Sequence, residues 1–241
     1  MVNQIDSRPS VTRGAGAAAA EIDQGLRSYM LGVYNYMCSG VLLTGLVALY
    51  VGTNQTAQAL IFGTALRYVA LFAPLAIVMV MSFGINRLSA TATKALFWVY
   101  AATMGLSLGS IFLIYTGSSI ARVFFISAAT FGALSLYGYT TKKDLSGFGT
   151  FLMMGLFGLI IASIVNIFLK SSMMEFVLSV VGVLIFAGLT AYDTQKIKSM
   201  YFAGDMADTV SKKIVMGALS LYLDFINLFL SLLRLFGGNR N

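Results

Sequence analysis

Seven long apolar stretches, separated by short polar connections, dominate the sequence. Each is close to the roughly 20 residues that an α-helix needs to cross a bilayer. A shorter apolar segment, 57–67, ends at Arg67, and we expect it to lie along the membrane interface as a helix. The fold is therefore predicted to be an all-α integral membrane protein with seven transmembrane helices, at 30–52, 68–86, 94–115, 119–140, 148–169, 174–194 and 213–236.

The pattern is different at the amino terminus. Residues 1–27 are polar and rich in Ala and Gly, and they lack the apolar segment of a secretory signal peptide. We expect a flexible cytoplasmic tail here, followed by one transmembrane domain at 28–241. The connections between spans are mostly too short to serve as domain linkers.

Composition supports the membrane assignment. Hydrophobic residues make up 58% of the 241 residues, charged residues 10%, and the mean hydropathy is +0.84, whereas a soluble domain carries about 25% charged residues. The sequence has no His and a single cysteine, Cys38. This excludes His-based catalysis, His metal sites, thiolate clusters and an internal disulfide.

The net charge of +7 comes from cations scattered between the apolar spans, which is typical of membrane topology and not of nucleic-acid binding. Five of the 16 Lys and Arg residues fall on the side of the carboxyl terminus: Arg67, Arg122, Lys170, Arg234 and Arg240. The other eleven fall on the side of the amino terminus. By the positive-inside rule, we expect the amino terminus in the cytoplasm and the carboxyl terminus outside.

Two aspartates stand apart from the other seven acidic residues, which lie in the tail, in loops or at span ends. Asp193 is at the cytoplasmic end of the sixth span and Asp224 is inside the seventh. The midpoint between them falls in the polar connection at 203–213. If the chain turns there, the two spans form an antiparallel hairpin and the two carboxyl groups return to nearly the same height.

A polar stripe also follows one face of the seventh span. Ser220, Asp224, Asn227 and Ser231 recur at helical spacing, and Thr190 lies one turn before Asp193. Such a stripe should face the bundle interior or a water-filled path, so these residues are candidates to line a pore. For the Ser and Asn side chains, hydrogen bonding between helices is the simpler interpretation.

The two aspartates are too costly in lipid to serve only as interhelical contacts, since a charged group at the helix centre costs at least about 2.5–3.5 kcal/mol. Two buried carboxylates cannot both ionise cheaply, so we expect them to share a proton and to act as a pH sensor or gate. The same pair could attract a hard cation such as calcium, which prefers oxygen ligands. Arg87, at the cytoplasmic end of the second span, could latch the path shut.

An enzymatic alternative uses the same two residues. Intramembrane aspartyl proteases carry a Tyr-Asp motif, and "AYD" at 191–193 fits it. The Gly-x-Gly-Asp motif is replaced by "LYLD" at 221–224, and the Pro-Ala-Leu motif is missing because no proline follows Pro74. We therefore do not expect an enzyme.

The two segments "GLTAYDTQKIK" (188–198) and "ALSLYLDFINLFLSLLRLFG" (218–237) carry a family resemblance. They resemble the bacterial branch of the Bax-inhibitor-like family of transmembrane Bax-inhibitor-motif proteins. The resemblance implies six helices around a central seventh, in the bacterial inner membrane. It also implies a pH-sensitive calcium leak governed by an aspartate pair at Asp193 and Asp224, with an arginine latch at Arg87 and no cofactor. Some bacterial members instead bind and modulate a membrane-anchored AAA protease of the quality-control system, which is the alternative function.

Overall fold

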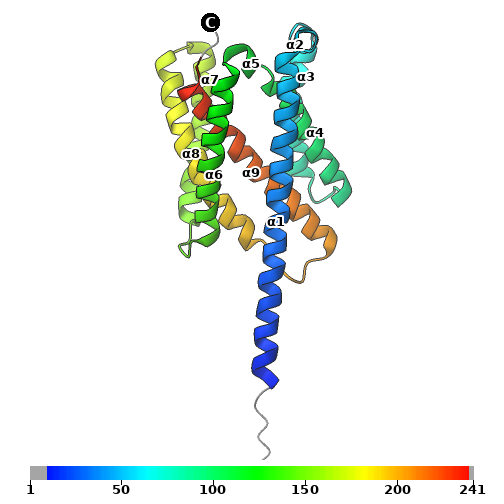
Figure 1. The fold of residues 1–241 in the computed structure, drawn as a ribbon. Coiled ribbons are helices and arrows are strands. Elements are labelled where there is room, and N and C mark those ends of the chain that lie inside the picture. The colour runs from blue at the N-terminus through cyan, green and yellow to red at the C-terminus, as the bar shows by residue number, and fades with distance from the viewer. Residues whose placement is uncertain (1–9, 239–241) are drawn as a thin grey trace, which may run out of the picture.

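The computed structural model describes residues 10–238, with side chains from residue 22 onward. This part of the chain is helical and contains the seven expected spans, which are long and apolar enough to cross a membrane (Figure 1). The helices are α1 (Ser10–Thr53), α2 (Gln55–Phe62), α3 (Leu66–Gly84), α4 (Ala90–Leu108), α5 (Ile111–Ile114), α6 (Gly117–Thr140), α7 (Ser146–Leu169), α8 (Ser172–Ser199) and α9 (Ala207–Phe236).

The first helix starts inside the predicted tail of residues 1–27. This helix begins at Ser10 and extends beyond the rest of the bundle (Figure 1). The Ala run at 17–20 favours it, since Ala has the highest helix propensity. Residues 1–9, which belong to the same predicted tail, lie outside the described residues.

Two other boundaries differ from the sequence-based ranges. The short helix expected at 57–67 is α2, which ends at Phe62, so Arg67 belongs to the first turn of α3. The third span is interrupted at Gly109, where α4 ends and α5 follows. Gly105 and Gly109 allow α4 to pack closely on α1, because a Cβ at Gly105 would lie 2.8 Å from the Thr44 carbonyl oxygen.

Helix α9 forms the core of the bundle. In its most apolar window 67% of residues are buried, against 6% in α7. It crosses the molecule diagonally (Figure 1) and packs mainly against α1, α4, α6 and α8. Helices α3 and α7 pack chiefly on α4 and α8, so the expected ring of six helices around the seventh is not confirmed.

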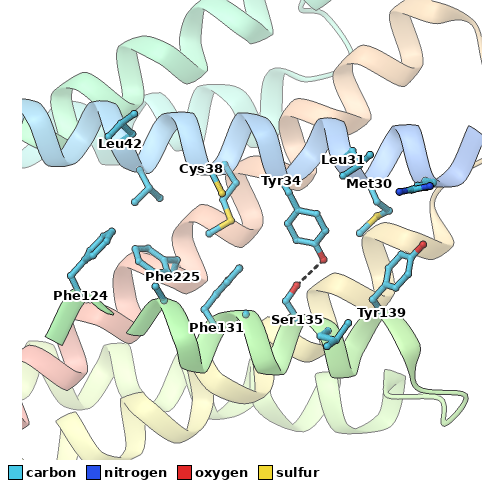
Figure 2. Close-up of a pocket in the computed structure, with 16 residues that line it drawn as sticks. Met30, Leu31, Tyr34, Cys38, Leu42, Phe124, Phe131, Ser135, Tyr139 and Phe225 are labelled. Carbon is cyan, nitrogen blue, oxygen red and sulfur yellow. Dashed lines mark hydrogen bonds between the residues drawn. The ribbon is translucent and has the colours of Figure 1, made fainter. Parts of the chain in front are cut away.

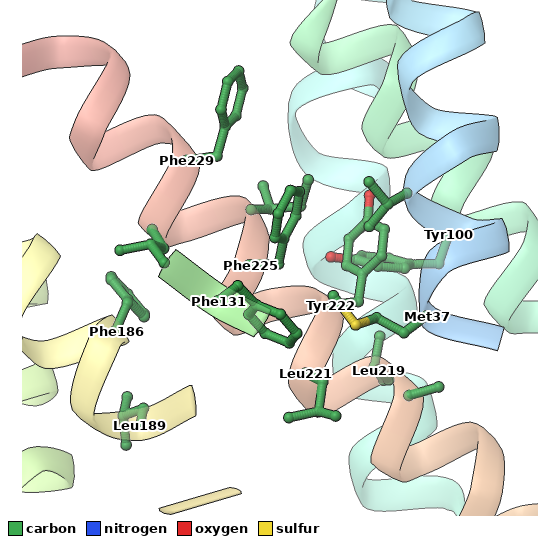
Figure 3. Close-up of a cluster of buried hydrophobic side chains, with 14 of the residues drawn as sticks. Met37, Tyr100, Phe131, Phe186, Leu189, Leu219, Leu221, Tyr222, Phe225 and Phe229 are labelled. Atoms are coloured by element: carbon green, nitrogen blue, oxygen red, sulfur yellow. The ribbon is translucent and has the colours of Figure 1, made fainter. Parts of the chain in front are cut away.

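Aromatic side chains fix α9 in this position (Figure 3). Tyr222 packs edge-on against Tyr100 of α4, with ring centroids 5.2 Å apart. Phe225 makes a similar contact with Phe131 of α6 at 5.7 Å. Such pairs add about 0.5–1.5 kcal/mol each beyond their buried area, and they hold Asp224, between these two residues of α9, inside the bundle.

Candidate functional site

The structure brings Asp193 of α8 and Asp224 of α9 together. The two carboxyl groups lie close enough to interact electrostatically. Asp224 is 5% exposed, whereas Asp193 is partly exposed. We refer to Asp193 and Asp224 as the aspartate pair.

The two members of the aspartate pair have different hydrogen-bond partners. The Ser220 hydroxyl donates to Oδ2 of Asp193 at 2.6 Å. Oδ2 of Asp224 is buried and accepts no hydrogen bond from any donor of the described residues. A buried carboxylate oxygen without a donor is costly. A proton carried by one of the two carboxyl groups would remove this cost, because that group could then donate to the other.

The hairpin that joins α8 and α9 turns earlier than expected. The connection is 200–206, so Asp193 lies near the end of α8 while Asp224 lies deep in α9. The second half of the predicted polar turn is instead the first part of α9. Lys213 holds the turn by donating to the Met200 carbonyl and by an ion pair with Asp205. The two residues nevertheless meet because α9 runs diagonally across the bundle.

Close packing around α8 fixes the position of Asp193. A Cβ at Gly138 of α6 would lie 2.2 Å from the Ala191 carbonyl oxygen, so only glycine allows this approach of α6 to α8. Gln195, two residues after Asp193, accepts from the Leu145 amide and donates to the Lys143 carbonyl, each at 2.8 Å. These contacts fasten the α6–α7 loop to α8. In this loop, hydrogen bonds from Ser146 lower the pKa of Asp144.

The other candidate pore-lining residues are Ser231, Asn227 and Thr190, and not all of them are free to act as ligands. Ser231 lies against Gly182 of α8. The Asn227 amide donates to the Leu223 carbonyl of its own helix at 2.8 Å, which leaves its oxygen as the group able to face a path. Thr190 is fully buried, and its hydroxyl donates to the Phe186 carbonyl at 2.7 Å.

Arg87 is not brought to the aspartate pair. It is exposed in the turn between α3 and α4, and no ion pair joins it to a carboxylate of the described residues. The cation that interacts with Asp193 is Lys196, one turn further along α8. Its role as a neighbour of the pair could have been inferred from the i, i+3 spacing alone.

A chain of hydroxyl groups beside the aspartate pair was missed by the sequence analysis. The Tyr34 hydroxyl of α1 is 2.7 Å from that of Ser135 on α6, which is 3.0 Å from that of Thr194 on α8. Thr194 in turn donates to the Thr190 carbonyl. The only signal in the sequence is that Thr194 directly follows Asp193.

The site does not resemble a resident metal centre. Within residues 10–238, no group of three or more His, Cys, Asp or Glu residues could hold a metal ion. Calcium takes six to eight oxygen ligands in stable sites, and the aspartate pair with Ser220 offers fewer.

Comparison with known proteins identifies relatives along nearly the whole chain. The family model described as "Inhibitor of apoptosis-promoting Bax1" matches residues 26–241. The Escherichia coli inner membrane protein YbhL is 50% identical over 219 residues, covering 90% of this chain and 94% of YbhL. An uncharacterized protein of Rickettsia prowazekii is 50% identical over 91% of this chain and 93% of its own. A Caulobacter vibrioides protein is 47% identical over 94% of both chains.

Proposed function

This chain belongs to the Bax inhibitor family of integral membrane proteins, and from that premise we propose that it is a cation leak pathway gated by protonation of the aspartate pair. The permeant ion is calcium, as the family resemblance implies. Its relatives are bacterial and YbhL is an inner membrane protein, so the pathway crosses the bacterial inner membrane.

One observation carries the proposal: a second carboxyl group faces the buried carboxyl of Asp224, whose Oδ2 has no other donor among the described residues. A polar contact between helices is worth about 0.6–2 kcal/mol. This is less than the cost of about 2.5–3.5 kcal/mol or more for an ionised aspartate at the centre of a membrane helix. A structural role alone therefore does not account for the two aspartates.

The pair can act as a switch because its charge depends on the number of bound protons. Two unit charges about 4 Å apart repel by about 4 kcal/mol at an effective dielectric constant of about 20. This is close to a thousandfold change in the balance between two conformations, since each 1.4 kcal/mol is tenfold. Loss of the shared proton thus changes both the force between α8 and α9 and the charge that a passing cation meets.

Calcium flux into proteoliposomes, measured against pH, tests the proposal. We expect Asp193→Asn and Asp224→Asn each to abolish the pH dependence. Asp23→Asn is the matched control, because Asp23 is exposed on α1. If both pair variants keep the wild-type flux and its pH dependence, the leak mechanism is wrong.

The latch is part of the same proposal. Arg87 would reach the pair only in a conformation different from the one described, since it is exposed and unpaired among residues 10–238. If it latches the path, Arg87→Ala raises the leak at neutral pH. An unaltered leak removes Arg87 from the mechanism.

A second candidate function is the binding and modulation of a membrane-anchored AAA protease. The projection of α1 beyond the bundle (Figure 1) favours it, because this end of the helix is available to a partner. Deletion of residues 1–20, which spares the span Ile22–Thr53, should abolish capture of such a protease in pull-downs while leaving flux intact. Capture that survives the deletion would exclude this surface.

A further inference from the structure

An apolar groove runs between α1 and α6 (Figure 2). Its volume is about 800 Å³. Helix α1 packs mainly on α4 and α9, whereas α6 packs on α8 and α9. Helices α1 and α6 therefore form the two sides of the groove, and Phe225 of α9 contributes to its floor. Leu31 and Leu136 on the two rims are 51% and 63% exposed, so the groove opens toward the lipid.

The groove has one charged end. Arg27 lines it at the start of the α1 span, on the side that the positive-inside rule assigns to the cytoplasm, and no described carboxylate pairs with it. Lys198 lies beside the same end, where its amino group sits over the Tyr139 ring at 4.7 Å. Toward the other end, the lining consists of apolar side chains such as Leu42 and Phe124 (Figure 2).

The length of the groove fits a lipid acyl chain. Arg27 and Leu42 are 15 positions apart on α1, which is about 22 Å at 1.5 Å per residue. One leaflet of hydrocarbon is about 15 Å thick, so the groove spans a leaflet and reaches the headgroup region.

We propose that this groove binds an anionic phospholipid of the inner, cytoplasmic leaflet. One acyl chain lies along α1 and α6 over Phe131 and Phe225, and the phosphate lies against Arg27, with Lys198 nearby. Charge complementarity selects the anionic headgroup, because the lining contains a cation at one end and no carboxylate. This proposal does not depend on the leak proposal.

Native mass spectrometry of the purified full chain, exchanged into detergent with equal phosphatidylglycerol and phosphatidylcholine, tests the proposal. We expect the wild type to retain one phosphatidylglycerol. Gly132→Phe should reduce retention at least tenfold, because Gly132 lines the groove and a side chain there enters open space. Gly158→Phe is the control: Gly158 is also open, but it is on α7 outside the groove. Arg27→Gln should remove the preference for phosphatidylglycerol, and Arg122→Gln should keep it.

Equal retention in the Gly132→Phe and Gly158→Phe variants would overturn the site. Equal retention of both lipids by the wild type would overturn the anionic headgroup. A dimer without bound lipid would assign the groove to a second copy of the chain.

Cys38 gives an independent readout because it lines the groove, is exposed and is the only cysteine. Its alkylation by a small maleimide should slow at least threefold with phosphatidylglycerol and not with phosphatidylcholine, and an unchanged rate would contradict the proposal.

Discussion

Removal of the Ser220 hydroxyl is expected to shift the pH response of the protein to higher pH. The hydroxyl donates to Asp193 at 2.6 Å and stabilises the ionised carboxylate more than the neutral acid. In Ser220→Ala the ionised form is less favourable, so deprotonation of the pair requires a higher pH. The sign is the same whichever protonation state conducts.

The size of the shift follows from the strength of this hydrogen bond. A hydrogen bond to a charged group contributes about 1.5–3 kcal/mol, and about 1.4 kcal/mol corresponds to one pH unit. Asp193 is partly exposed, so water replaces part of the lost interaction and the lower end of the range applies. We therefore expect the midpoint of the flux–pH curve to move up by about one pH unit.

Calcium flux into dye-loaded proteoliposomes, recorded over a pH series, measures this midpoint. Ser127→Ala is the matched control, because Ser127 is another serine in a span but donates to the Val123 carbonyl of its own helix. Its midpoint should equal that of the wild type. A Ser220→Ala midpoint that is unchanged, or that moves down, would refute the reasoning.

Three further variants probe the surroundings of the site. Gly138→Ala places a Cβ 2.2 Å from a backbone oxygen of α8 and should lower the free energy of unfolding, measured in denaturant titrations, by about 1–3 kcal/mol. Gly132→Ala is the control, because its Cβ meets open space on the same helix and should not lower the stability. Equal stabilities of the two variants would contradict the packing. Gln195→Ala removes two hydrogen bonds to the α6–α7 loop and should speed hydrogen exchange of the Leu145 amide; unchanged protection would show that the loop is held otherwise. Lys196→Gln removes a cation that interacts with Asp193 and should raise the flux midpoint by a few tenths of a pH unit, less at high salt because the side chain is exposed. A midpoint insensitive to Lys196 would exclude this interaction.

The spans could be predicted because crossing a bilayer imposes a length and an apolar composition that are visible in the letters. The aspartate pair could be predicted for a related reason. Asp224 stands out as an acidic residue in an apolar helix, and Asp193 is the acidic residue that an antiparallel hairpin can bring close to Asp224. The hydrophobic pattern did not reveal the diagonal course of α9. That course depends on aromatic contacts such as Tyr222 with Tyr100, which belong to helices distant in the sequence.

Neither the bounds of the α8–α9 turn nor the surroundings of Arg87 could be predicted from the sequence. The polar residues at 207–213 are compatible with either a loop or the start of a helix, and the structure makes them the first turns of α9. Arg87 was linked to the pair by its place at the cytoplasmic end of the second span and by the family resemblance, whereas Lys196 is placed beside Asp193 by helix geometry. The hydroxyl chain from Tyr34 to Thr194 joins three helices, so it depends on tertiary packing that no local pattern encodes.

The central claim is that Asp193 and Asp224 act as one titrating unit, and a double-mutant cycle on calcium flux tests it most directly. The account predicts that Asp193→Asn and Asp224→Asn each lose the wild-type pH response and that the double variant loses no more of it, because either substitution already removes the proton that the two carboxyl groups share. Additive effects of the two substitutions, or a pH dependence that persists in the double variant, would contradict it.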